Sequence, residues 1–148
     1  MFEYGGGMSS QQDEIRTALD AVEAGYARLR AACSDSVGNA FRVEVAERLE
    51  SQHRTNRGLT YRFFGEINDP PDGLDDPALP KGTVIRKLLW QRLHITGPEV
   101  RRRFTLAGRI RPRRSLTGPA LQPELPQLAA AVENGEVDDD HIAAVFKV

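Results

Sequence analysis

The sequence predicts an all-α fold: a long N-terminal helical hairpin followed by two short pairs of helices, each similar to a helix-turn-helix. Apolar residues recur at helical spacing along most of the chain, and no segment alternates apolar and polar residues as a half-buried strand does. Prolines and glycines gather in residues 68–80 and 111–123, which separate the helical segments. A length of 148 residues suits one domain, which can bury roughly 70% of the surface that the unfolded chain exposes.

The first predicted helix covers residues 10–33 and follows a flexible leader, residues 1–9, in which three consecutive glycines make ordering costly in entropy. Ser10 and Asp13 have the spacing of a capping box at the start of this helix. Its apolar residues alternate at spacings of four and three and therefore form one stripe: Ile15, Leu19, Val22, Tyr26, Leu29 and Cys33.

A second predicted helix covers residues 37–67 and pairs with the first as an antiparallel hairpin, residues 10–67. Its polar middle, residues 51–58, indicates a kink or partial exposure. Residues 68–80 hold four of the nine prolines and several aspartates, so we predict a loop there that is the best internal boundary of the chain. The apolar side of the second helix consists of six residues: Phe41, Val45, Leu49, Leu59, Phe63 and Ile67.

The remaining region, residues 81–148, is predicted to form two pairs of short helices. The first pair covers residues 83–94 and 97–110, joined by about four residues as in a helix-turn-helix. The second pair covers residues 124–133 and 138–147. An irregular segment rich in proline and glycine separates the two pairs.

Capping residues support both pairs. Thr96 is predicted to cap the second helix of the first pair, and Glu99 completes a capping box with it. Gly135 suits the position after the end of the next helix, and Asp138 is a natural N-cap for the last one. The aspartates that follow Asp138 favour the positive end of that helix, which explains them without a metal site.

The net charge of −1 conceals a strongly polarised chain. Residues 81–114 contain eleven basic residues and one acid, Glu99, and therefore carry a net charge of +10. The rest of the chain, with nine basic and twenty acidic residues, carries −11. A basic helix pair of this kind favours a nucleic-acid partner. Two alternatives stay open: a basic face that is simply solvated, and docking of the basic block on the chain's own acidic residues.

The second helix of the first pair has a predicted inner and outer face. At 100° per residue, Val100, Phe104 and Ala107 face the core, which places Arg102 and Arg109 on the outer side. We expect these two arginines to face a groove of DNA. Seven further cations are expected to neutralise phosphates: Lys87, Arg92, Arg101, Arg103, Arg111, Arg113 and Arg114.

The sequence lacks the residues that a disulfide, a metal site, a membrane span or a secretion signal requires. Cys33 is the only cysteine, so the chain has no internal disulfide and no cysteine pair for zinc, and a reducing cytoplasm is the expected compartment. No apolar run approaches the roughly 18 residues of a membrane span, and the N-terminus does not resemble a secretion signal. The three histidines lie far apart, and Leu79 stands where a calcium loop beginning at Asn68 needs glutamate. We therefore expect no active site, no metal and no cofactor in this chain.

Four stretches of the sequence carry a resemblance to a known family: Met1–Glu3, Ile95–Phe104, Arg113–Pro126, and Glu133–Val137 leading into His141 and Ile142. The pattern Leu-Thr-Gly-x-x-Leu-x-Pro-x-Leu-Pro within the third stretch is the most specific of them. On these residues the chain resembles the N-terminal region of the actinobacterial 13E12-repeat proteins, also called domain-of-unknown-function family 222. The similarity covers most of residues 10–148.

Many proteins of that family carry a C-terminal HNH endonuclease domain, whereas their N-terminal region has no established activity. The chain ends at Val148 before any HNH motif, so the resemblance implies no catalytic residue here. We therefore expect a non-catalytic module, not an enzyme, that contacts DNA through residues 83–114, as a homodimer or with a separate HNH nuclease chain. The alternatives are a protein-interaction or oligomerisation module, and a non-functional truncated relic of a mobile-element-associated gene.

Overall fold

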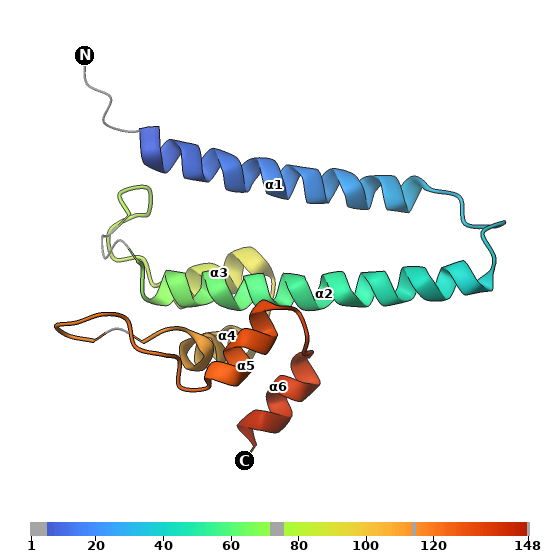
Figure 1. The fold of residues 1–148 in the computed structure, drawn as a ribbon. Coiled ribbons are helices and arrows are strands. Elements are labelled where there is room, and N and C mark those ends of the chain that lie inside the picture. The colour runs from blue at the N-terminus through green and yellow to red at the C-terminus, as the bar shows by residue number, and fades with distance from the viewer. Residues whose placement is uncertain (1–5, 72–75, 114, 148) are drawn as a thin grey trace. The chain divides into compact units, whose positions relative to one another are not determined.

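The computed structural model describes residues 6–71, 76–113 and 115–147, and among these it contains six α-helices and no strand (Figure 1). The predicted all-α class is thereby confirmed. The chain divides into two compact units, residues 1–43 and 44–148. No helix of the described residues is long and apolar enough to cross a membrane.

The first unit contains α1 (Gly6–Ala31) and the beginning of α2 (Asn39–Asn68). α1 begins four residues before the predicted start at Ser10, inside the predicted leader, of which residues 1–5 lie outside the described residues. Every residue of the predicted α1 stripe, from Ile15 to Cys33, is exposed. The pairing of α1 with α2 as a hairpin stays a prediction.

The second unit is built on α2 from Glu44 onward, with α3 (Ile85–Leu93), α4 (Gly97–Ile110), α5 (Pro126–Glu133) and α6 (Asp139–Phe146). These four shorter helices gather beside the carboxyl-terminal half of α2 (Figure 1). The core of the unit is formed by buried residues of α2, α4, α5 and α6: Tyr61, Phe64, Val100, Phe104, Leu106, Ala107, Leu128, Val132 and Ile142.

α2 turns a different face to this core from the apolar side that the sequence predicts. Tyr61 and Phe64 are buried, whereas five of the six residues on the predicted side, among them Phe63 and Ile67, are exposed. At 100° per residue, Phe63 lies about 160° around the helix from Tyr61. The predicted apolar side therefore lies opposite the face that packs, and it contributes nothing to the core of the second unit.

Two glycines of α2 allow a close approach of its neighbours. A Cβ atom at Gly58 would lie 2.6 Å from the carbonyl oxygen of Val132 in α5, and one at Gly65 would lie 2.8 Å from Cδ of Arg111. Such separations are too short for any larger residue without a shift of the backbone or side chain. At Gly58, therefore, the backbone of α5 lies directly against α2.

The two predicted N-caps of the short helices are confirmed. Oγ1 of Thr96 accepts a hydrogen bond from the backbone N–H of Glu99 at 3.2 Å. Oδ1 of Asp138 accepts one from the N–H of His141 at 2.9 Å. Each cap satisfies a backbone donor that has no partner within its helix, which fixes where α4 and α6 begin.

The predicted glycine after α5 is also confirmed. Gly135 has a φ of 68°, a conformation in which other residues are strained. Its N–H donates to the carbonyl oxygen of Val132 at 3.1 Å, and the N–H of Glu136 donates to that of Ala131 at 2.9 Å. This pair of bonds is a Schellman motif, which ends α5 and turns the chain toward α6.

The segment predicted to be irregular after α4 contains one local pairing. Arg113 and Leu121 form an isolated antiparallel bridge through two backbone hydrogen bonds of 3.0 and 2.7 Å. The bridge closes a loop, which we call the arm, and Leu116 within it is fully exposed. The predicted bounds of α4 agree with the structure, and the other short helices begin or end within two residues of their predicted bounds.

The close approach of Val132 to Gly58 predicts that a larger residue at position 58 destabilises the protein. We expect Gly58→Ala to lower the free energy of unfolding by roughly 1–3 kcal/mol, because the added methyl group must displace the carbonyl oxygen of Val132. Urea titration followed by far-ultraviolet circular dichroism measures this change.

Gly108→Ala is the matched control, since Gly108 is also helical and has nothing within 4 Å of the added Cβ atom. It should raise the free energy of unfolding by roughly 0.5–1 kcal/mol, because alanine loses less backbone entropy than glycine in a helix. Equal effects of the two substitutions would contradict the packing described for α2 and α5.

Candidate nucleic-acid interface

α3 and α4 form the helix-turn-helix-like pair that the sequence predicts. The turn between them spans residues 94–96, and His94 within it has a left-handed backbone with a φ of 53°. Ile85 and Leu89 of α3 pack against the core, whereas Leu93, one turn after Leu89 at the end of the helix, is exposed. α3 is therefore held to the unit by its first two turns and leaves its outer side open.

α4 is enclosed on most of its circumference. Val100, Phe104 and Ala107 are buried, as predicted, and Leu106 is buried as well. The exposed stripe of α4 consists of Arg101, Thr105 and Gly108. The prediction that Arg102 and Arg109 lie on the outer face therefore needs correction, because both are partly covered by side chains of other helices.

Glu99 gathers three arginines around its carboxylate. Arg102 donates two hydrogen bonds to it, from Nε and Nη2, both at 2.8 Å, and Arg103 donates a third from Nε at 2.9 Å. Nη2 of Arg57 in α2 lies 3.8 Å from the same carboxylate. Glu99 thus ties α4 to α2, in place of closing the predicted capping box with its own side chain.

Asp139, at the start of α6, extends this cluster to a third helix. Its carboxylate accepts hydrogen bonds from Nη2 of Arg57 and, at 2.8 Å, from the hydroxyl of Tyr61, and it lies 3.9 Å from Nη2 of Arg102. The Arg57 side chain is only 15% exposed. We call these six residues of α2, α4 and α6 the arginine cluster: Arg57, Tyr61, Glu99, Arg102, Arg103 and Asp139.

The contacts of the arginine cluster shift the pKa values of its acids. Hydrogen bonds from Arg102 lower the pKa of Glu99 from 4.5 to about 2, against a smaller opposing effect of burial. Burial alone would raise the pKa of Asp139, but hydrogen bonds from Arg57 and Tyr61 outweigh it and hold the pKa below its ordinary value. Both carboxylates are therefore ionised at neutral pH and neutralise much of the positive charge beside them.

Three further predicted contact residues also have partners within the unit. The Arg109 guanidinium stacks 4.7 Å from the ring centroid of Phe146 and lies 3.8 Å from the carboxylate of Glu124. Nη1 of Arg111 donates to the carbonyl oxygen of Gly65 and lies 3.9 Å from the carboxylate of Asp69.

Arg113 donates from Nε to the carbonyl oxygen of Gln122 at 3.0 Å, within the arm that it closes. Arg114, also a predicted contact, lies outside the described residues. The sequence alternative in which the basic block docks on the chain's own acids is thus met in part, through Asp69, Glu124 and Asp139.

Four cations of the basic block, residues 81–114, are exposed, and their side chains have no hydrogen bond, ion pair or ring contact within the described part of the chain. They are Lys81, Lys87, Arg92 and Arg101. Lys87 and Arg92 belong to α3, and Arg101 lies on the exposed stripe of α4. We call these four residues the open cations.

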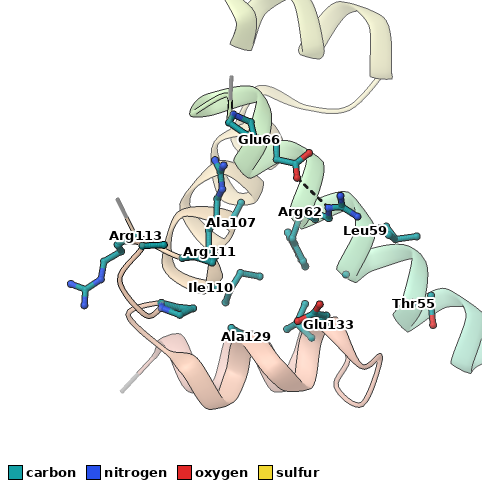
Figure 2. Close-up of a pocket in the computed structure, with 17 residues that line it drawn as sticks. Thr55, Leu59, Arg62, Glu66, Ala107, Ile110, Arg111, Arg113, Ala129 and Glu133 are labelled. Atoms are coloured by element: carbon teal, nitrogen blue, oxygen red, sulfur yellow. Dashed lines mark hydrogen bonds and ion pairs between the residues drawn. The ribbon is translucent and has the colours of Figure 1, made fainter. Parts of the chain in front are cut away.

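A cavity of about 700 Å³ opens between α2, the end of α4, α5 and the segment around Arg113 (Figure 2). Its lining is largely apolar, and the arginines at its rim already have partners. Arg62 pairs with Glu66 at 3.1 Å, as the dashed line in Figure 2 shows, while Arg111 and Arg113 bond to backbone oxygens. The cavity therefore offers no free cation to an anionic ligand.

Sequence reasoning missed two features of this surface. Arg57 and Tyr61 lie in or beside the polar middle of α2, and that polarity was itself the signal that this stretch contacts other polar groups. Trp90, the only tryptophan, is half-exposed on α3 among basic residues. Within the described residues, no group of three or more histidines, cysteines or acids could hold a metal ion.

The sequence is similar to one protein family and to several mycobacterial proteins. A model of the family described as "Domain of unknown function (DUF222)" matches residues 43–148. The uncharacterized protein Rv1148c of Mycobacterium tuberculosis and the uncharacterized protein Mb1179c of Mycobacterium bovis are each 31% identical to this chain over 137 residues, which are 93% of this chain and 29% of theirs. The uncharacterized protein Rv3466 of Mycobacterium tuberculosis is 28% identical over 93% of this chain and 60% of its own. No solved structure matches the chain.

The lowered pKa values in the arginine cluster predict that the protein loses stability at acidic pH. Because Glu99 and Asp139 bind protons less readily in the folded protein than in the unfolded chain, their contribution to stability is complete above the ordinary pKa of Glu99, 4.5, and is lost as the pH falls toward about 2. Urea titrations at a series of pH values should show this loss.

Glu99→Gln should lower the free energy of unfolding by roughly 1–3 kcal/mol at neutral pH, because it removes a charged acceptor shared by two arginines. It should also flatten the pH dependence below 4.5. Glu23→Gln, at an exposed position of α1, is the control and should keep the pH dependence of the parent protein. A parent and a Glu99→Gln variant with the same pH dependence would refute the role given to Glu99.

Proposed function

The chain belongs to the DUF222 family, and from that premise we propose that it is a non-catalytic module that contacts DNA. The observation that supports this function is the set of open cations, of which Lys87 and Arg92 lie on α3, Arg101 on the exposed stripe of α4, and Lys81 just before α3. Three of the four belong to one helix-turn-helix-like pair, and residues 81–98 contain no acid. Such a surface attracts a polyanion by charge and releases counterions when phosphates bind.

The eight predicted contact residues that the structure describes fall into two groups, three whose side chains have no partner within the described residues and five whose side chains do. Lys87, Arg92 and Arg101 are free to bind phosphate. Arg102 and Arg103 would have to leave the carboxylate of Glu99, at a cost in folding free energy, before they could reach DNA. We therefore assign phosphate contact to the first three, together with Lys81, and a structural role to Arg102 and Arg103.

The mycobacterial relatives are longer than this chain. The chain spans about 29% of the length of the mycobacterial proteins with which it shares 31% identity. We propose that any catalysis, such as that of the HNH nuclease domain implied by the family resemblance, comes from another part of the protein or from a separate chain. The task of the present region is then to bring that part to DNA.

A second candidate function, self-association, is favoured by one observation on the first unit. The α1 stripe, from Ile15 to Leu29, has side chains 40–56% exposed and the alternating spacing of a coiled-coil seam. A second copy of the chain is the occupant to test. Sedimentation velocity over a range of protein concentrations should then show a dimer, and Leu19→Lys should convert it to a monomer. A monomer at all concentrations removes this candidate.

The open cations make a quantitative prediction for DNA. Titration of a labelled duplex should give an affinity that falls steeply with salt, because each phosphate contact contributes roughly 0.9 to the slope of log affinity against log salt. Replacing Lys87, Arg92 and Arg101 together with alanine should reduce that slope by up to about 2.7.

The matched control replaces three exposed arginines that lie outside the basic block, Arg28, Arg30 and Arg48, and so changes the net charge equally. It should keep most of the slope of the parent protein. No binding at low salt, or equal losses in the two triple variants, would refute DNA contact through the open cations.

A further inference from the structure

Trp90 is the exposed aromatic residue of the basic helix pair. It is 49% exposed, although Ile85 and Leu89 of the same short helix pack against the core. Tryptophan has the largest apolar surface of any side chain, so an indole left half in water marks a surface that another molecule can cover. No ring and no guanidinium of the described residues stacks on this indole.

The surroundings of Trp90 are basic. On α3, Arg86 and Lys87 precede it by four and three residues, and His94 follows it by four, so all three lie along the same side of the helix. The Arg86 guanidinium is held 5.3 Å from the ring centroid of Phe104, which leaves the Trp90 ring free of it. α3 contains no acid. A partner for this surface must therefore combine negative charge with an apolar face.

The apolar stripe of α1 differs from this surface in charge. Asp20 and Glu23 lie among its apolar residues together with Arg16, so it has the mixed charge of a helix that pairs with another protein segment. The surface of Trp90 has one sign of charge and a flat aromatic ring. That combination matches a nucleotide, whose phosphate is anionic and whose base has a flat face that stacks on indole.

From these contacts we propose that Trp90 stacks on an unpaired base, so that α3 binds a single-stranded segment of nucleic acid in preference to duplex. The inference rests on the proposed nucleic-acid function and names the form of DNA that it recognises. In a duplex the faces of the bases are occupied by their neighbours, so only an unpaired base has a face to offer. Lys87, three residues before Trp90 and on the same side of the helix, supplies charge for an adjoining phosphate.

The fluorescence of Trp90 tests this directly, because no other tryptophan contributes to the signal. Addition of oligothymidylate at low salt should quench the emission, as stacking on indole does. A duplex of equal length should quench it little and bind more weakly. Duplex binding without any preference for the single strand overturns the stacking inference but leaves the proposed function intact, whereas absence of binding to both refutes the two together.

Variants separate stacking from charge. By anisotropy of a labelled oligothymidylate, Trp90→Leu should weaken binding by roughly 10-fold or more, and Trp90→Phe should restore part of it because phenylalanine keeps a ring. Val84→Ala, which shortens another exposed apolar side chain at the start of α3, is the matched control and should bind as the parent does. Circular dichroism of each variant shows whether it is folded.

Two outcomes would overturn the inference. The first is equal single-strand affinity of the Trp90→Leu variant and the parent. The second is a Trp90 emission that changes with protein concentration alone, since a second copy of the chain would then be the molecule that covers the indole.

Discussion

The carboxylate of Glu99 lies where three helices meet, and it accepts hydrogen bonds from Arg102 and Arg103 while Arg57 approaches from α2. Charges that are partly removed from water interact more strongly than those at an open surface, so this acid and the apolar residues of α4, among them Phe104, together hold α4 against α2. Asp139 completes the arrangement by binding Arg57 from α6. Without these two acids, three guanidinium groups would be half-buried side by side with no counter-charge.

The same arrangement explains how a chain with a net charge of −1 can present a basic surface. Acids of α4 and α6, together with Asp69 just after α2 and Glu124 before α5, pair with the partly covered arginines of the basic block. The open cations, among them Lys87 and Arg101, are exposed on this helix pair or, for Lys81, just before it. The basic residues thus have two roles. The paired arginines hold the helices together, and the open cations form the surface that we propose for DNA. Trp90 lies on the second of these surfaces.

The features that the sequence predicts correctly depend on neighbouring residues. The caps at Thr96 and Asp138 and the glycine turn at Gly135 involve hydrogen bonds over three to five residues, so their spacing in the sequence is sufficient to identify them. The placement of Arg102 was wrong because its nearby partner Glu99 is drawn toward Arg57 of α2, and that contact, like the one with Asp139, joins residues distant in sequence. The inward side of α2 was not predicted because the helix has an apolar face on either side, and only the packing of Tyr61 distinguishes them. Composition revealed the polarised charge but not how it is divided between fold and surface.

The division of the arginines into a paired and an open group is the central claim, and nuclear magnetic resonance of their Nε–H groups tests it most directly. With nitrogen-15-labelled protein, addition of DNA should shift the Nε–H signals of Arg92 and Arg101 and leave those of Arg102 and Arg103 in place. Shifts confined to Arg102 and Arg103, with Arg92 and Arg101 unchanged, would contradict the account.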